Sequence, residues 1–364
     1  MIDFGAVLTR VVRENCTDAH FQPGSPPLIR KIKDLIPVGT DYLTSQDTAM
    51  ILEKTLSEER RKRFEKDLEA DYAYTLAGQF RFRVNAHYHL GTVGLSFRLC
   101  RTDILSFETL RLPPVIRELA ALERGLILLT GITGSGKSTT LAAMISHINE
   151  TRHCHIVTVE DPVEFIHEDK MSLVTQREVG TDTKSFLEAL RRVLRQDPDV
   201  ILIGEMRDRE TIRTAISAAE TGHLVFSTLH VVQAAIAVDR ILSFFAREEQ
   251  DQVREQIAMN LQGVVSQRLL SSADRTFILP ALEIMIGTAT VRKLIAEGRT
   301  RDLPQAMQNG EAGMQTLNQH LVKLVQSGLV AQEEALKNSD NPVALRRAIA
   351  GGYAGGDRQS IIGV

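Results

Sequence analysis

The sequence has few cysteines, and they are not placed to form a cluster. Among 364 residues only three are cysteine, Cys16, Cys100 and Cys154, and they lie far apart. A disulfide framework or a structural zinc site needs cysteines at characteristic close spacings. We therefore expect free thiols of the kind found in a reducing compartment, with neither a disulfide framework nor a zinc site.

Long apolar runs and an excess of charge are absent as well. No apolar run approaches the roughly 18 residues of a membrane-spanning helix, and the opening MIDFGAVLTRVVREN lacks the apolar centre of a signal peptide. The net charge of −3 argues against bulk electrostatic binding of nucleic acid. We expect a cytoplasmic protein of two domains, with no nucleic-acid partner and only peripheral membrane association.

The strongest motif is the glycine-rich segment GITGSGKS, residues 131–138. It follows an apolar run and precedes a helix-like stretch, which is the context of a phosphate-binding loop. Glycines allow the backbone N–H groups to surround phosphate oxygens, and the helix adds its positive end. We expect Lys137 to reach the β- and γ-phosphates and the Ser138 hydroxyl to bind Mg²⁺. The residues predicted to bind ATP are Gly131, Thr133, Gly134, Ser135, Gly136, Lys137, Ser138 and Thr139.

Short strands rich in Val, Ile and Leu alternate with helices after this point, which predicts an α/β fold with a buried parallel sheet. The predicted strands are 126–130, 156–160, 200–204 and 224–228, and the predicted helices are 185–195, 210–219, 233–244 and 248–270. The predicted organisation is a small α/β domain over 1–100, a linker over 101–116, a core over 117–290, a helical portion over 291–350 and a flexible tail over 351–364.

The first domain contains two segments with the alternation of half-buried strands, 79–87 and 93–99. If they pair, Arg81, Arg83 and Arg98 share one polar face. That face is either an ordinary solvated sheet surface or a basic face offered to a phosphate elsewhere. Residues 44–67 are predicted to form one helix, with Ser45 as its cap.

Acidic and histidine side chains follow the predicted strands at their carboxyl ends, where open parallel sheets bind ligands. Glu160 and Glu164 follow the second strand, Glu205 follows the third, and His230 closes the fourth. Two carboxylates beside a phosphate loop suit a nucleotide hydrolase, since one can orient the Mg²⁺ shell and another can polarise the attacking water. The acid that orients Mg²⁺ is usually an Asp directly after the apolar strand. Here Gly204 takes that place and Glu205 follows.

The segments GITGSGKS, VTVEDPVEF, ILIGEMRDRETIR and AAETGHLVFSTLH together resemble the secretion and type IV pilus ATPase family, in its PilT- and PilU-type retraction branch. The resemblance covers nearly the whole chain. It implies a homohexameric ring at the cytoplasmic face of the inner membrane, with a PAS-like N-terminal domain and a RecA-like ATPase domain in each subunit. Such a ring uses ATP and Mg²⁺ to retract type IV pili through an inner-membrane platform protein, which drives twitching motility.

The resemblance also implies roles for individual residues. Glu164 is the better candidate for the base that activates water, and Glu205 for the Mg²⁺ shell. Glu160 and His230 are further catalytic candidates. Arginines of the N-terminal domain approach the nucleotide in such motors, and Arg83 and Arg98 are the candidates here.

Two features of the sequence depart from the retraction ATPases, so alternative functions stay open. Segment 290–297 reads TVRKLIAE where retraction ATPases carry AIRNLIRE, so Ala296 replaces the second arginine. The C-terminal portion looks more like PilU, which favours an accessory subunit, or a nucleotide-binding regulatory partner, that depends on a PilT-type paralogue. A pilus assembly or type II secretion ATPase is disfavoured, because no cysteine after Cys154 could form the four-cysteine insert of those proteins.

Overall fold

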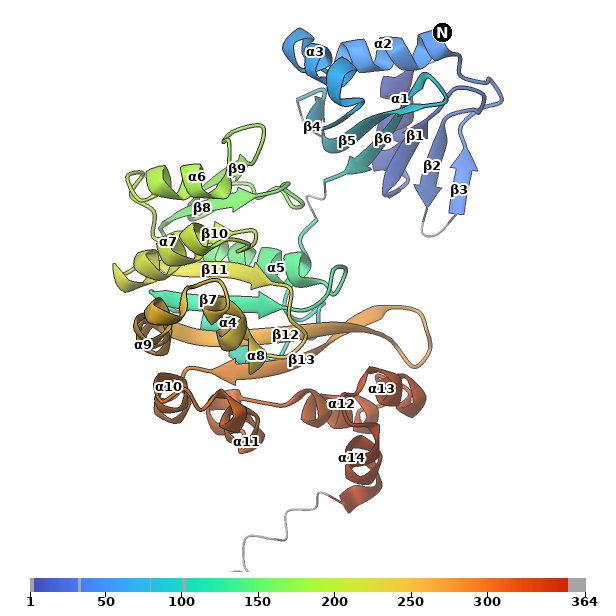
Figure 1. The fold of residues 1–364 in the computed structure, drawn as a ribbon. Helices are drawn as coiled ribbons and strands as arrows, with labels where there is room; N and C mark the ends of the chain where they lie inside the picture. The colour runs from blue at the N-terminus through green and yellow to red at the C-terminus, as the bar shows by residue number, and fades with distance from the viewer. Residues whose placement is uncertain (1–2, 32–33, 79, 101–102, 353–364) are drawn as a thin grey trace, which may run out of the picture. The chain divides into compact units, whose positions relative to one another are not determined.

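The computed structural model describes residues 3–31, 34–78, 80–100 and 103–352 (Figure 1). The chain divides into two compact units. The first consists of Met1–Thr102 with Pro162–Ile166 and Glu178–Asp182, and the second of Asp103–Asp161, His167–Arg177 and Thr183–Val364. Each unit contains a β-sheet and helices, so the predicted α/β class is confirmed. The segment 353–364, where the sequence predicts most of a flexible tail, lies outside the described residues.

The first unit is built on a six-stranded sheet in the order β3-β2-β1-β6-β5-β4, in which all the paired strands are antiparallel. Its strands are β1 (Asp18–Phe21), β2 (Leu28–Lys31), β3 (Asp34–Pro37), β4 (Glu69–Leu76), β5 (Phe80–His89) and β6 (Thr92–Leu99), and its helices are α1 (Phe4–Arg13), α2 (Ser45–Thr55) and α3 (Glu58–Asp67).

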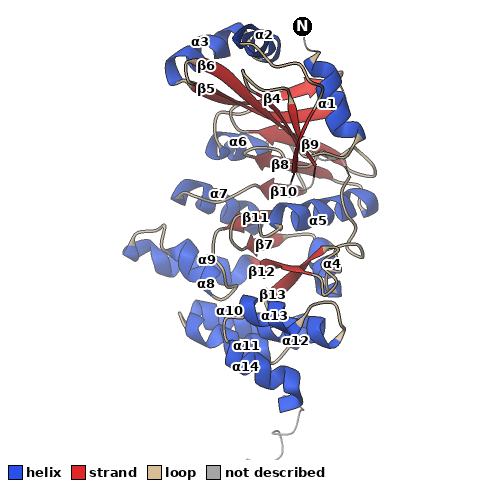
Figure 2. Cartoon of the chain, turned by 90° about the vertical axis from the view of Figure 1, so that its right-hand side faces the viewer, coloured by secondary structure: helices blue, strands red, loops and turns tan. Residues whose placement is uncertain are grey.

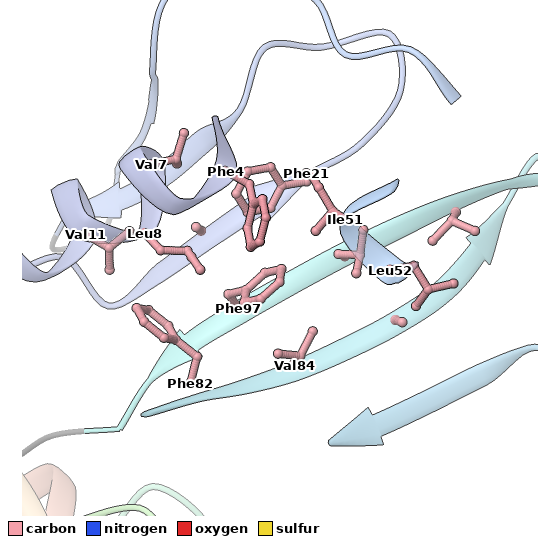
Figure 3. Packing of buried hydrophobic residues seen from close by; sticks show 14 of the residues in the cluster. Phe4, Val7, Leu8, Val11, Phe21, Ile51, Leu52, Phe82, Val84 and Phe97 are labelled. Carbon is pink, nitrogen blue, oxygen red and sulfur yellow. The ribbon is translucent and has the colours of Figure 1, made fainter. Parts of the chain in front are cut away.

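The core of this unit forms between α1, α2 and one face of the sheet (Figure 3). Helix α1 contributes Phe4, Val7, Leu8 and Val11, which recur at helical spacing and are buried. The strands contribute every second residue, such as Phe82, Val84 and Phe97. The rings of Phe21 and Phe97 pack edge to face with centroids 5.4 Å apart.

The opposite face of the same sheet is polar, as the alternation predicts. Strands β5 and β6 pair antiparallel, and the register places Arg83 directly opposite Arg98. Arg81 lies two residues from Arg83 on the same strand and therefore shares this face. The predicted pairing of the two segments is confirmed.

The single helix predicted over 44–67 is wrong, because two helices occupy this stretch. Leu56 adopts an extended backbone with φ −117° and buries its side chain, which separates α2 from α3. The cap of α2 is Thr44 rather than Ser45. The Thr44 hydroxyl accepts from the Asp47 N–H at 3.2 Å, and the Asp47 carboxylate accepts from the Thr44 N–H at 2.9 Å.

The second unit is built on a seven-stranded sheet in the order β13-β12-β7-β11-β10-β8-β9. The four strands predicted to form a parallel sheet do so, since β7 pairs in parallel with β11, β11 with β10 and β10 with β8. The bounds are β7 (Gly125–Thr130), β8 (His155–Glu160), β9 (Leu173–Glu178), β10 (Val200–Ile203), β11 (Leu224–Leu229), β12 (Leu261–Ser271) and β13 (Ile278–Ile286).

Helices cover both faces of this sheet, with α5 on one face and α6 and α7 on the other (Figure 2). The helices are α4 (Pro114–Ala120), α5 (Lys137–Thr151), α6 (Phe186–Val193), α7 (Arg209–Glu220), α8 (Ile236–Leu242), α9 (Gln250–Asn260), α10 (Ala289–Ala296), α11 (Leu303–Gln308), α12 (Leu317–Gln326), α13 (Gln332–Asn338) and α14 (Pro342–Arg347). No helix within the described residues is long and apolar enough to cross a membrane.

The long helix predicted over 248–270 is also wrong. Helix α9 ends at Asn260, and the chain continues as β12, which pairs in parallel with β7. An apolar run such as Leu261–Ser271 fits either a buried helix or a buried strand, and pairing with β7 and β13 decides for the strand. Strand β13, which the sequence analysis did not predict, completes the edge of the sheet.

Candidate active site

The candidate site lies at one edge of the seven-stranded sheet. Strands β7, β11, β10 and β8 are consecutive parallel neighbours, so the segments that follow them leave the sheet at the same edge. The phosphate loop follows β7, His230 follows β11, Glu205 follows β10, and Glu160 ends β8. The structure therefore brings these four predicted features together.

The phosphate loop joins β7 to α5 through backbone conformations that require glycine. The φ angles of Gly131, Gly134 and Gly136 are 143°, 78° and 86°, all in the range that side chains disfavour. Helix α5 begins at Lys137, directly after Gly136. The first N–H groups of α5, which have no partner within a helix, therefore point into the loop that the glycines form.

Lys137 lies within this loop and is 8% exposed. Its Nζ atom donates to the carbonyl oxygens of Gly131 at 2.8 Å and Ile132 at 3.0 Å. Ser138 and Thr139 occupy the first turn of α5 and are half-buried. Thr133 is exposed, and Ser135 is buried. The ammonium group is thus held at the place where the positive end of α5 meets the loop.

Glu205 and His230 form a pair across the ends of β10 and β11. The Oε2 atom of Glu205 lies 3.3 Å from His230 Nε2, and its other carboxylate oxygen contacts the Arg207 guanidinium. The Glu205 side chain is 13% exposed, whereas that of His230 is 47% exposed. A largely buried carboxylate is thereby held between an imidazole and a guanidinium.

Gly204 precedes Glu205 for a steric reason. A Cβ atom at this position would lie 3.3 Å from both the Glu160 Cα and the Val159 carbonyl oxygen. The loop is held close to β8 and β11, since Gly204 N donates to Val159 O at 2.8 Å and Thr228 Oγ1 donates to Gly204 O at 2.7 Å. Because Gly204 directly follows β10, the acidic side chain is that of Glu205, one residue later than the usual Asp.

Glu160 is half-buried and points to neighbours that the sequence did not reveal. Its Oε1 atom accepts from Thr158 Oγ1 at 2.6 Å and from Gln176 Nε2 at 3.4 Å. Gln176 belongs to β9, and its side-chain Oε1 atom accepts from the His167 N–H at 2.9 Å. No motif or apolar alternation in the sequence of β9 singled out Gln176.

Side chains of β12 and β13 form hydrogen bonds with the segment that follows His230, residues 231–234. Ser266 Oγ donates to the Val232 carbonyl at 2.9 Å, and the Ala234 N–H donates to Glu283 Oε2 at 2.8 Å. Burial raises the pKa of Glu283, although the Ala234 N–H opposes this shift. His223, before β11, lies 2.9 Å through Nδ1 from the Ala218 carbonyl, which fits a structural role.

Three predicted site residues belong to the first compact unit. Glu164 is exposed and lies in the segment Pro162–Ile166. Arg83 is half-buried on the polar face of the sheet, with no hydrogen-bond or ion-pair partner for its side chain within the part of the chain that the structure describes. Arg98 is 67% exposed and donates through Nε to Asp18 Oδ1 at 2.7 Å.

Comparisons with known proteins agree with this arrangement. The family model "Type II/IV secretion system protein" matches residues 96–350. The type IV pilus retraction ATPase PilT of Pseudomonas aeruginosa is 43% identical over 342 residues, which are 94% of this chain and 99% of that protein. The type IV pilus ATPase PilU of the same organism is 38% identical over 349 residues, covering 96% of this chain and 91% of the relative.

A solved structure is similar over almost the same length. The crystal structure of the pilus retraction motor PilT with bound ADP is 40% identical, with a TM-score of 0.89, and the match covers 95% of this chain and 100% of that chain. The similarity therefore includes the N-terminal unit as well as the RecA-like unit with the phosphate loop. The chain belongs to the type II/IV secretion system ATPases, as a PilT-like member of that family.

Proposed function

We propose that this chain is a motor that couples ATP hydrolysis to retraction of type IV pili. The observation that carries the proposal is the Glu205–His230 pair at the sheet edge that also holds the phosphate loop. A carboxylate and an imidazole beside bound phosphates are groups that phosphoryl transfer can use. Two relatives, the pilus retraction ATPase PilT of Pseudomonas aeruginosa and a twitching motility protein of Neisseria gonorrhoeae, support the same function.

Within this proposal, the loop of residues 131–138 binds the phosphates through its N–H groups, Lys137 neutralises their charge, and Thr139 completes the first turn of α5. The oxygen donors Ser138 and Glu205 fit Mg²⁺, which binds proteins through one or two oxygen ligands together with phosphates and water. When bound, the metal ion would neutralise phosphate charge during transfer. The fit rests on the hydroxyl of Ser138, a half-buried residue, and on the largely buried carboxylate of Glu205.

Glu164 is proposed to accept the proton of the attacking water, because it is an exposed carboxylate in the acidic segment that follows β8. Glu160 is proposed to hold this segment through Thr158 and Gln176. Arg83 is the better candidate for an arginine that acts on a nucleotide, because the guanidinium of Arg98 is already bound to Asp18.

The proposed assembly is a homohexamer that docks on an inner-membrane platform protein at the cytoplasmic face of that membrane. A PilU-like accessory role is the alternative. Two observations concern segment 290–297, where the sequence departs from the retraction ATPases. Ala296 ends α10, and the other arginine of the segment, Arg292, donates to the carbonyls of Gly287 at 2.7 Å and Ala258 at 2.9 Å. Arg292 is therefore part of the packing between α9 and α10.

A deletion strain tests the function and its alternative together. We expect normal or excess surface pili and weakened retraction under load, restored by the wild-type gene and not by Lys137→Ala. If a PilT-type paralogue is present, retraction that persists in the deletion strain would assign the accessory role. Cells without surface pili would contradict retraction and indicate an assembly motor.

A further inference from the structure

Strand β12 runs directly beside the phosphate loop. It pairs in parallel with β7, and the register matches Val265 with Leu129 and Ser266 with Thr130. The next residue along β12, Gln267, therefore lies beside Gly131, where the loop begins. Gln267 is 2% exposed, so a polar side chain is buried under the loop.

Two glycines of the loop pack against Gln267. A Cβ atom at Gly131 would lie 2.6 Å from the backbone oxygen of Gln267, and a Cβ atom at Gly136 would lie 2.6 Å from Gln267 Nε2. Contacts this short are closer than side chains tolerate. At Gly131 the Gln267 backbone oxygen and the Ser135 hydroxyl leave no room for a side chain, whereas at Gly136 the contact is with the end of the flexible Gln267 side chain and the positive φ angle is what favours glycine.

The amide of Gln267 also reaches the helix that follows the loop. Its Oε1 atom accepts from Thr140 Oγ1 at 2.8 Å, and both residues are buried. One glutamine thus contacts the entry of the loop, its last glycine and the first turn of α5. Because Lys137 Nζ donates to the Gly131 carbonyl, the position of Gly131 also fixes that of the ammonium group.

We propose that Gln267 is a positioning residue for nucleotide binding, which holds the phosphate loop and the start of α5 in the shape that binds phosphates. The inference rests on the proposed role of the loop. Gln267 acts through the loop and α5, so its removal weakens the binding of the ground state and of the transition state by the same amount. Equal loss from both states raises KM and leaves kcat nearly unchanged.

The test uses Gln267→Met, which keeps the length of the side chain and removes both polar groups. We expect the Kd for ADP and the KM for ATP to rise about tenfold, as the loss of one buried hydrogen bond predicts, with kcat within about threefold of wild type. Thr140→Val removes the other partner of the same hydrogen bond and should shift Kd in the same direction, whereas Thr140→Ser should retain wild-type affinity.

The matched control is Gln315→Met. Gln315 is a buried glutamine, 3% exposed, that donates to the Leu282 carbonyl at 3.1 Å and accepts from Lys323 at 3.0 Å. Its replacement should lower the melting temperature and leave the Kd for ADP unchanged. A Gln267→Met protein with wild-type Kd and KM would overturn the inference, as would a fall in kcat alone. If Gln267→Met does not fold, wild-type Kd in Thr140→Val gives the same negative result.

Lys137→Ala separates failure of the inference from failure of the proposed function. If this variant binds ADP as wild type does, the loop is not the nucleotide site, and the proposed function fails with the inference. If Lys137→Ala loses ADP binding while Gln267→Met and Thr140→Val keep it, the proposed function stands and the inference alone is wrong.

Discussion

His230 Nε2 lies 3.3 Å from Glu205 Oε2, across the ends of two neighbouring parallel strands. The imidazole is the more exposed partner, and the carboxylate also contacts Arg207. Neither residue would be interpretable alone, since a single acid at the end of a strand is often a helix cap. Their pairing beside a phosphate loop gives a carboxylate with a defined orientation and an imidazole that faces the same edge.

Glu205→Gln should lower ATP turnover by about 10²-fold or more, the scale typical of lost catalytic side chains. The amide keeps the shape but not the charge, so half-maximal activity should also need more Mg²⁺. Steady-state ATPase assays across a magnesium titration provide the measurement. His230→Asn is the companion variant, and its Mg²⁺ requirement should equal that of wild type. An unchanged requirement in Glu205→Gln would remove Glu205 from the proposed Mg²⁺ shell.

Lys137→Ala and Glu164→Gln should fail in different ways. The first removes the charge that holds the phosphates, so nucleotide affinity and turnover should both be lost. The second keeps size and loses basicity, so ATP should bind while turnover falls about 10²-fold or more. Equilibrium binding and steady-state kinetics on the same preparations separate the two. Glu168→Gln is the control, because Glu168 is an exposed glutamate four residues along the chain. Wild-type turnover in Glu164→Gln would point to Glu160 or Glu205 as the base.

Arg83 and Arg98 lie opposite each other on paired strands and should nevertheless respond differently to substitution. Arg83→Ala should lower turnover with little change in ATP affinity, by about 10³-fold or more if it acts as an arginine finger. Arg98→Ala should destabilise the first unit by about 1–3 kcal/mol, because the nearly buried Asp18 loses its partner. Kinetics and urea unfolding measure the two effects. Loss of turnover in Arg98→Ala with unchanged stability would reverse the assignment.

The pH dependence of the Arg98 variant gives a second readout. Burial raises the pKa of Asp18, but hydrogen bonds from Thr17 and Arg98 outweigh it, and the net shift is downward. A carboxyl whose pKa is lowered on folding stabilises the protein above its unfolded pKa, and this stabilisation is lost as the pH falls through the folded value. The difference in stability between wild type and Arg98→Ala should therefore shrink below about pH 4.

His320 should make the protein sensitive to mild acid. Burial, with a smaller effect of Lys323, lowers its pKa to about 4. Its Nδ1 atom accepts from the Leu282 N–H at 2.8 Å, which requires the neutral ring. The unfolded histidine binds a proton near pH 6.5, so stability should fall as the pH drops from there toward 4, by on the order of 3 kcal/mol.

His320→Asn tests this directly, because its side-chain oxygen can accept from the same N–H. Urea unfolding at pH 7.5 and at pH 5 should show a smaller loss of stability in this variant than in wild type. His89→Asn, at an exposed position, should retain the wild-type pH dependence. Identical pH dependence in wild type and His320→Asn would show that other groups cause the acid sensitivity.

Features that depend on neighbours along the chain could be predicted from the residues alone. The phosphate loop needs backbone angles that only glycine adopts easily, so the motif GITGSGKS could be identified from the sequence. Short runs of Val, Ile and Leu predicted the buried strands β7, β8, β10 and β11. The pairing of β5 with β6 followed from alternation, which is a property of the extended chain.

Features that depend on partners distant in the sequence could be seen only in the folded chain. Leu261–Ser271 is apolar enough for a helix or a strand, and it is a strand because β7 and β13 offer it hydrogen bonds on both sides. Three contacts join residues far apart along the chain: Gln267 with the phosphate loop, Asp18 with Arg98, and Gly204 with the end of β8. Sequence periodicity reports which face of an element is buried, and it carries no information about which side chain of another element lies against that face.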